Sequence, residues 1–423
     1  GLPDRGYGAS KLLGLLGVAW ISWILSSLRL LESGAFATGL AWALVLGAGL
    51  LAVRGRVPQL LAELRERWAW LVGAEAVMLA AYTGMVLVRS LNPDIWNPAR
   101  PGQGPLFLAM FNAIARSPYF PPYDPWLSGG HLHTPYWGQV PWAMLAVLTQ
   151  IVPATAYSLA FAGVFALLCV LLWSGAAALI ARLTGTCGWR TLLTALAAPV
   201  GIGVLGTLVV ARRIGEGAWG YPPRPGSWPA LGGLGDVLYG AWQIARRRLE
   251  PPPGLYHEAL DLQPTLRMEI PYFGFLAGEL GPMTTALPFI ALAALLAIAL
   301  ATREGSRVGG AWRLDGTDMA LLILGGACCG LMQASTTWGF LPTVALMVSA
   351  AAIRVGTAHG WHSGWLVVRD AAIAATIIVL SALVAFWPFL DGYTTNGRDI
   401  LPPPALGLGA YLTHYGLFLL PVV

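Results

Sequence analysis

Residues 157–181 read YSLAFAGVFALLCVLLWSGAAALIA and contain no charged side chain. A helix of this length, at about 1.5 Å per residue, can cross a bilayer hydrocarbon core of roughly 30 Å. Apolar runs of the same kind recur along the whole chain, at 12–31, 36–53, 68–88, 191–210, 284–301, 319–333, 341–353, 367–387 and 406–423. The sequence therefore predicts an all-α polytopic membrane protein, 1–423, with a single transmembrane domain and about ten transmembrane helices.

The composition supports lipid as the solvent. Of the 423 residues, 57% are hydrophobic and 11% charged, whereas a soluble domain has about 25% charged residues. The net charge of +5 comes from arginines in short clusters between apolar runs, and this pattern argues against a nucleic-acid partner. The sequence lacks a Walker loop, a dinucleotide fingerprint and a nucleophile elbow. The cysteines lack zinc spacing and are expected to be packing residues: Cys169, Cys187, Cys328 and Cys329.

The arginine clusters predict the topology. Short loops rich in arginine face the cytoplasm, and in this chain such loops occur at 54–67, 182–190, 303–313 and 354–369. Two longer segments, 90–139 and 211–283, then fall on the extracytoplasmic side. The first is rich in Pro, Gly, Trp and Tyr, and we expect it to contain an interfacial helix over 105–116. The apolar run 140–152 is too short to span the membrane and is expected to be interfacial or re-entrant.

Several polar residues that could take part in catalysis or binding lie on this predicted outer face. Asp94 follows the third span and could be a general base, although an Asx-turn or helix cap explains it as well. His131 and His133 are two residues apart and would share one face of a strand, so they could bind a metal or form ordinary loop hydrogen bonds. Glu269 and Glu279 could coordinate a divalent cation or be solvated or capping carboxylates.

Two further features allow a functional and a structural interpretation. Glu75 lies inside a predicted span, where an ionisable group usually faces the bundle interior or a cavity. The 19 tryptophans and 13 tyrosines would suit sugar stacking, and interfacial aromatic belts explain them equally well. A transporter is less consistent with the sequence, because the polar groups collect in loops and no pair of broken helices lies at mid-membrane.

Several motifs resemble the YYY (Chlor-Arch-YYY) family of integral membrane proteins. They are LPDRGYG at 2–8, RSLNPD at 89–94, FNAIARSPYFPPYDPWLSGG at 111–130 and PYWGQ at 135–139. The resemblance implies a GT-C-like fold, whose members transfer sugars from lipid-phosphate carriers at the outer membrane face. Resembling proteins have further helices before and after the part seen here, so we expect this chain, which opens with Gly1, to belong to a longer protein.

The resemblance also implies that catalytic positions have been replaced. The family typically has an aspartate at Phe107 and a histidine at Gln139. Its acidic-His-Pro-His motif reads here as Glu279, Leu280, Gly281, Pro282 and Met283, and its Asn-x-Trp-Asp element reads as Thr336, Thr337, Trp338 and Gly339. Phe, Met and Gly side chains can neither transfer protons nor coordinate cations. Asp94, Glu75 and Glu269 are kept.

Two functions follow as expectations. The first is a catalytically degenerate GT-C-like membrane protein that serves as a binding or scaffold subunit, with membrane lipid and other membrane proteins as partners. The alternative is an active glycosyltransferase that uses a polyprenyl-phosphate-linked sugar. In that case Asp94 would be the base, Glu269 and Glu279 would hold a divalent cation, and the substrate contacts would be Tyr136, Trp137, Trp338 and Glu269.

Overall fold

The computed structural model describes residues 4, 6–91, 104–186, 188–201, 261–263, 266–267, 275, 279–303, 314–359 and 364–393. One compact unit, Gly1–Pro199 with Phe275–Asn396, contains all the helices described below. A second unit, Val200–Gly274 with Gly397–Val423, contains a short antiparallel pair of strands, β1 (Asp261–Gln263) and β2 (Leu266–Arg267). In the described part of the chain, the regular secondary structure is therefore helical apart from this pair and an isolated bridge between Tyr123 and His131.

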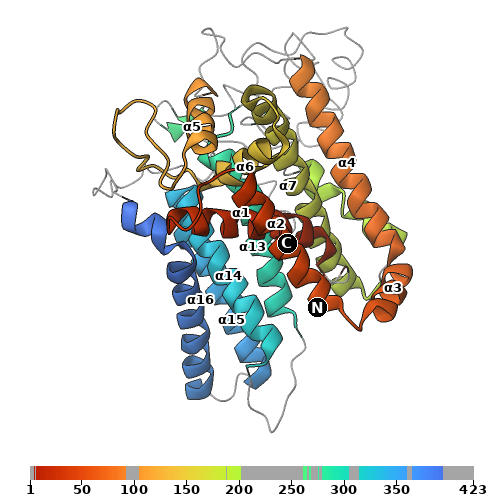
Figure 1. Ribbon diagram of the computed structural model, residues 1–423. Coiled ribbons are helices and arrows are strands. Elements are labelled where there is room, and N and C mark those ends of the chain that lie inside the picture. The colour runs from red at the N-terminus through yellow and green to blue at the C-terminus, as the bar shows by residue number, and fades with distance from the viewer. Residues whose placement is uncertain are drawn as a thin grey trace. The chain divides into compact units, whose positions relative to one another are not determined.

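The helices follow one another in the order seen in Figure 1. They are α1 (Tyr7–Ser27), α2 (Ala35–Val53), α3 (Val57–Glu66), α4 (Trp68–Leu91), α5 (Gly104–Arg116), η1 (Trp137–Gln139), α6 (Val140–Thr149), α7 (Pro153–Thr184), α8 (Trp189–Thr194), α13 (Pro282–Ala301), α14 (Gly316–Ser335), η3 (Thr337–Gly339), α15 (Phe340–His359) and α16 (Gly364–Gly392).

Eight of the described helices are long and apolar enough to cross a membrane. They are α1, α2, α4, α7, α13, α14, α15 and α16, and each covers a run that the sequence predicts as a span, except that α1 ends at Ser27, before the end of the predicted run 12–31. The short run at 140–152 forms the ten-residue helix α6, and the predicted interfacial helix appears as α5. The predicted span 406–423 lies outside the described residues.

The predicted span 191–210 is described only as far as residue 201, and there a turn at 195–196 interrupts the helix before residues 197–201 return to helical geometry. Helix α8 ends at Thr194, and the chain then turns through hydrogen bonds from Leu196 N to Leu193 O and from Ala198 N to Ala195 O. Pro199 has no N–H with which to continue an α-helical ladder, and its ring crowds the carbonyl one turn earlier. An apolar run therefore does not become one continuous helix here.

Close packing of small residues joins α14 to α16, which lie side by side in Figure 1. Residues 326–330 read GACCG, the small-xxx-small pattern that lets two helix backbones approach in a membrane. A Cβ atom on Gly326 would lie 2.4 Å from Ile378 O, and one on Gly330 would lie 2.5 Å from Ala382 O. Cys328 and the other described cysteines are free and buried, as expected for packing residues.

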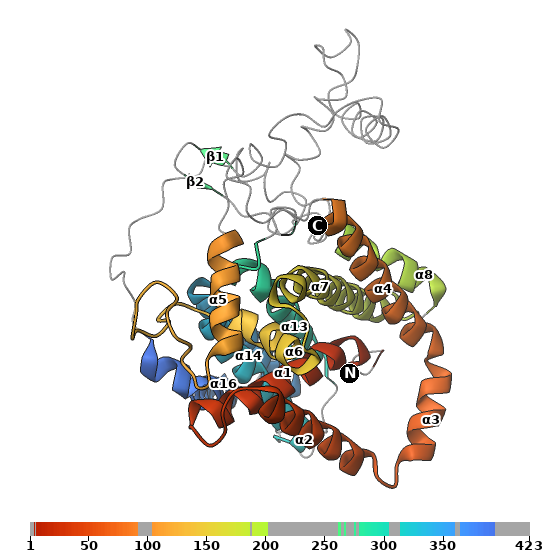
Figure 2. The ribbon, with the colours of Figure 1, turned by 45° about the horizontal axis from the view of Figure 1, so that its top comes forward.

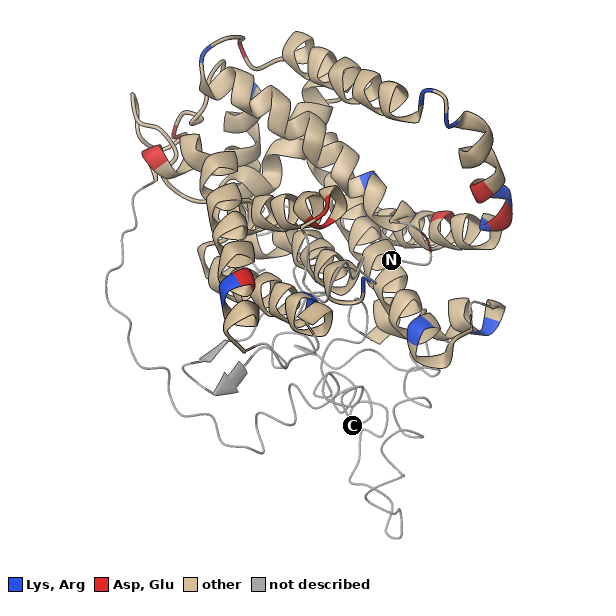
Figure 3. Cartoon of the chain, turned by 90° about the horizontal axis from the view of Figure 1, so that it is seen from below, with Lys and Arg blue, Asp and Glu red and all other residues tan. Residues whose placement is uncertain are grey.

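Contacts between loops divide the bundle into two ends. At one end Ser33 N donates to Pro118 O, His133 Nδ1 lies 3.0 Å from Gly392 O, and Thr337 Oγ1 lies 2.7 Å from Tyr393 OH. We call this the aromatic end, formed by residues 28–34, 117–139, 279–281, 336–339 and 392–393. The other, the arginine end, is formed by the described residues 54–67, 182–186, 188–190, 302–303, 314–315, 359 and 364. Figure 3 shows that charged residues in the described part are sparse along the helices and gather mainly near helix ends.

Two helices of the bundle share one direction. Helices α7 and α13 run parallel, because Tyr157 OH accepts a hydrogen bond from Leu280 N near their beginnings and Gly175 packs against Leu295 further along. Helix α4, with 24 residues, carries the chain about 36 Å along its axis from the arginine end. Which end faces the cytoplasm stays a prediction.

An ion network holds the arginine end together. Arg303 donates to Asp315 at 2.6 Å and to Asp318 at 2.7 Å, and Arg354 donates to Asp318 at 3.1 Å. The guanidinium of Arg303, together with two backbone N–H groups of α14, lowers the pKa of Asp315 to about 2. Asp318 and Arg354 are almost fully buried, so the network ties α13, α14 and α15 to one another.

The lowered pKa of Asp315 predicts a pH-dependent stability difference. We expect Asp315→Asn, which keeps the helix cap, to be less stable than wild type by up to about 1 kcal/mol above pH ~4, because the carboxylate is 38% exposed. The unfolded chain binds the proton first as pH falls, so the difference shrinks below pH ~4 and is gone below about 2. Detergent-denaturation curves at several pH values measure it, and a difference that grows in acid contradicts the assignment.

Candidate functional site

Four segments that are far apart in the sequence meet at the aromatic end. They are α5, the PYWGQ turn at 135–139, the start of α13, and the turn between α14 and α15. Gln139 is central, because its Nε2 donates to Phe107 O at 3.1 Å and to Leu280 O at 2.7 Å. We call this meeting point the junction, defined by residues 107–110, 135–139, 279–285 and 335–339.

Two glycines allow the segments to approach closely. A Cβ atom on Gly138 would lie 2.1 Å from Thr285 Oγ1, and one on Gly281 would lie 2.6 Å from Phe107 Cε2. Real Cβ atoms do not approach other atoms at these distances, so a larger residue at either position would force its neighbours to shift. The ring of Phe107 therefore packs directly on the first turn of α13.

The α14–α15 turn completes the junction. Thr336 Oγ1 lies 3.5 Å from Met283 Sδ, which places the turn beside the start of α13. A Cβ atom on Gly339 would lie 2.1 Å from Met332 Cε, so the turn is folded tightly on α14. Phe107, Gln139, Gly281 and Thr336 thus belong to one site.

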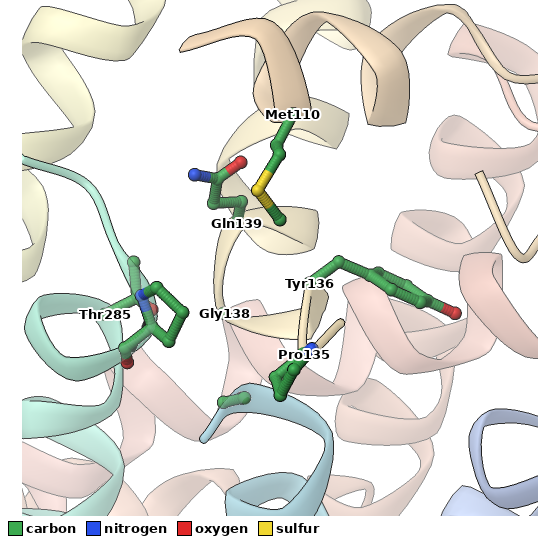
Figure 4. Close-up of a pocket in the computed structure, with 8 residues that line it drawn as sticks. Met110, Pro135, Tyr136, Gly138, Gln139 and Thr285 are labelled. Carbon is green, nitrogen blue, oxygen red and sulfur yellow. Dashed lines mark hydrogen bonds between the residues drawn. The ribbon is translucent and has the colours of Figure 1, made fainter. Parts of the chain in front are cut away.

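A small pocket lies inside the junction (Figure 4). Its space between atoms, about 170 Å³, includes open solvent, and it is nowhere wide enough for a water molecule. Because it has no room even for water, it does not hold a sugar as it stands. Its lining comes from all four segments: Met110, Pro135, Tyr136, Gly138, Gln139, Pro282, Thr285 and Ser335.

Two buried polar atoms of the pocket lining, Gln139 Oε1 and Ser335 Oγ, have no hydrogen-bond partner among the described residues. The two carbonyl groups that accept from Gln139 Nε2 determine the orientation of the amide, and the oxygen then points the other way. In Figure 4 the amide of Gln139 lies beside Met110, and the ring of Tyr136 points away from it. An unpaired buried acceptor costs about 1–3 kcal/mol, so the pocket keeps unused hydrogen-bonding capacity.

Aromatic rings enclose the neighbouring part of the turn. Trp137 packs edge-to-face against Trp23 and Phe386, with ring centroids 6.1 and 5.3 Å apart. Tyr136 OH accepts a hydrogen bond from Trp23 Nε1 at 3.3 Å, and burial raises the pKa of this tyrosine. The side chains of Tyr136 and Trp137 are both buried in this cluster. Contact of either residue with a substrate stays a prediction, and it would require the cluster to open.

Of the other predicted site residues, the structure describes Trp338 and Glu279. Trp338 lies on η3 and is 86% exposed, so its ring is free to contact a ligand or lipid. Glu279 is half-buried, immediately before α13 at the junction. Asp94 and Glu269 lie outside the described residues, so the structure tests neither the proposed base nor the proposed pair of carboxylates. Among the described residues, no group of three His, Cys, Asp or Glu side chains could hold a metal ion.

The histidine pair has an ordinary structural explanation. His131 pairs with Tyr123 in an isolated β-bridge, and His133 Nδ1 lies 3.0 Å from the carbonyl oxygen of Gly392. These contacts fasten the loop to the end of α16. They agree with the loop interpretation of the two residues.

Glu75 has partners from α1. Its Oε1 accepts hydrogen bonds from Tyr7 OH and Lys11 Nζ, while Asp4 binds the neighbouring backbone and Ser174 Oγ at 2.6 Å. The motif at 2–8 therefore connects α1 to α4 and α7. This cluster lies in the half of the bundle that ends at the arginine end and is separate from the junction.

The contact between Phe107 and Gly281 was not anticipated from the sequence. The sequence feature that could have indicated such a contact is a glycine between bulky residues, as at Gly138 in PYWGQ. Such a glycine often marks a place where another segment approaches the backbone closely. Such a glycine does not identify what approaches it.

Comparison with known proteins identifies the family. Residues 18–423 match DUF2298, a family described as uncharacterized membrane protein. No curated protein and no solved structure matches the chain. The match covers nearly the whole sequence and agrees with the eight apolar helices, which support a multi-pass location in a membrane. This chain belongs to the DUF2298 family of membrane proteins.

Proposed function

We propose that this protein is a GT-C-like membrane protein whose catalytic pocket has been filled, and that it serves as a binding or scaffold subunit of a membrane assembly. The single observation that carries the proposal is the convergence at the junction. Phe107, Gln139, Gly281 and Thr336 are positions where the resemblance to the YYY family implies lost polar groups, and they lie together although the sequence separates them widely.

The chemistry of the replacements supports loss of catalysis. The phenyl ring of Phe107 occupies the space over Gly281, and Met283 contributes a thioether beside Thr336. Neither a ring nor a thioether transfers protons or binds a hard divalent cation. A polyprenyl-phosphate sugar would need both space and charged groups, and the described part of the junction supplies a narrow pocket with neutral lining.

An active glycosyltransferase remains the second candidate, because Glu279 keeps a carboxylate at the junction. In that case Asp94 would act as base, with a divalent cation held by Glu269 and Glu279 at the extracytoplasmic face. Tyr136, Trp137 and Trp338 would contact the sugar or its carrier.

A transfer assay separates the two functions. Protein purified in mild detergent is incubated with polyprenyl-phosphate-linked sugars, with and without divalent cations. We expect no turnover above background in wild type, Asp94→Asn or the matched control Asp391→Asn, which changes an exposed acid at the aromatic end. Metal-dependent turnover that Asp94→Asn abolishes and Asp391→Asn keeps would overturn the proposal.

The scaffold role needs its own measurement. We expect that the natively expressed protein, extracted from membranes in mild detergent, forms a complex of defined mass with another membrane protein. The same mass should be found for Asp94→Asn, since assembly would not depend on a base. Purification as a lone chain under conditions that preserve other membrane complexes contradicts the scaffold role.

A further inference from the structure

Helix α3 joins two candidate spans and is set apart from the bundle. Helix α2 ends at Val53 and α4 begins at Trp68, so the ten residues of α3 lie between two membrane-spanning helices at the same membrane surface. Figure 2 shows α3 bridging the ends of α2 and α4 away from the other helices. No residue of α3 is buried.

The sequence of α3 is amphipathic. Val57, Leu60, Leu61 and Leu64 follow the i, i+3, i+4, i+7 spacing that places apolar side chains on one helical stripe. Val57 is 48% exposed and Leu61 is 52% exposed. Gln59, Glu63 and Glu66 lie on the opposite side of the helix by the same periodicity. Within the described part of the chain, no protein segment covers the apolar stripe.

Positive charge flanks this stripe at both ends. Arg54 and Arg56 precede α3, Arg65 lies in its last turn, and all three are exposed. Trp68, at the beginning of α4, is 63% exposed, and tryptophan prefers the boundary between headgroups and acyl chains. Guanidinium groups bind phosphate oxygens through paired hydrogen bonds, so the charge complements anionic headgroups.

We propose that α3 is an interfacial helix that binds anionic phospholipid at the arginine end. Its apolar stripe enters the boundary between headgroups and acyl chains, and Arg54, Arg56 and Arg65 contact lipid phosphates. This follows the general behaviour of amphipathic helices with an apolar face and basic residues. The connection to α2 and α4 already holds α3 at the membrane surface, so lipid is the occupant that the geometry favours over a soluble protein.

Spin-label accessibility tests the placement. Nitroxide labels are attached at Leu61→Cys and Leu60→Cys on the stripe, and at Gln59→Cys on the opposite face as the matched control. Cys187 is replaced by serine, and the described cysteines are buried. In vesicles of phosphatidylcholine with an equal part of phosphatidylglycerol, the ratio of oxygen to nickel-chelate collisions should be several-fold higher at 60 and 61 than at 59.

Lipid selectivity is tested with the same labels. In phosphatidylcholine alone we expect the ratio at position 61 to fall. The triple variant Arg54→Gln, Arg56→Gln, Arg65→Gln should remove the difference between the two vesicle types. Two results would overturn the proposal: a stripe more accessible to the nickel chelate than position 59, which means exposure to water, or a stripe shielded from both reagents, which means a protein partner covers it.

Discussion

Replacing Asp318 with leucine is expected to lower the free energy of unfolding by about 3–5 kcal/mol. The carboxylate is fully buried at the start of α14, where it accepts hydrogen bonds from Arg303 at 2.7 Å and Arg354 at 3.1 Å. Leucine leaves the guanidinium of Arg354, which is 3% exposed, without this carboxylate in a low-dielectric environment. Unfolding by sodium dodecyl sulfate in mixed micelles measures the loss.

The double variant Asp318→Leu, Arg354→Met provides the decisive control. Replacing both members of a buried ion pair with apolar side chains is often neutral, whereas removing one leaves a buried charge. The double variant should therefore be more stable than Asp318→Leu alone. Asp391→Leu, at an exposed acid of α16, should change stability by less than about 0.5 kcal/mol. Equal losses in the single and double variants would contradict the role of the pair.

The contact between Phe107 and Gly281 is expected to show strong coupling between two mutations. Phe107→Ala should cost about 3–5 kcal/mol by removing a ring that is 8% exposed. Gly281→Ala should cost about 1–3 kcal/mol, because its Cβ would lie 2.6 Å from the ring. The backbone of Gly281, with φ −78° and ψ 175°, is open to alanine, so the clash and not the backbone causes the loss.

Combining the two changes should recover part of this loss. Without the ring, the alanine methyl at 281 has room and fills part of the space that Phe107 leaves. We expect the double variant to be at least about 1 kcal/mol more stable than the sum of the single effects predicts. Gly14→Ala is the matched control, since a Cβ there meets no atom within 4 Å and the helix favours alanine. Simple additivity of the two changes would place Phe107 away from Gly281 in the folded protein.

Local sequence was enough to predict most of the helices. The run at 157–181 had to form a helix in lipid, because backbone N–H and C=O groups find no water there and must pair within the segment. The same reasoning anticipated the short α6 and the helix over 105–116. It did not anticipate the turn at 195–196, which interrupts an apolar run, nor α3, whose ten residues lie within an arginine-rich turn.

The candidate site was only partly predictable. Motif comparison named Phe107, Gln139, Gly281 and Thr336 individually, but it gave no reason for them to be close in space. Their meeting depends on Gln139 reaching two carbonyl groups and on Gly281 receiving a ring. Neither contact leaves a periodic signal in the sequence.

The sequence by itself determined that this is a membrane protein and located the eight described helices that are long and apolar enough to cross a bilayer, because length and hydropathy act locally along the chain. Only the tertiary structure decided which side chains fill the junction and that the apolar stripe of α3 is exposed. Side-chain packing joins residues far apart in the sequence, and its outcome depends on shapes and distances that local patterns do not specify.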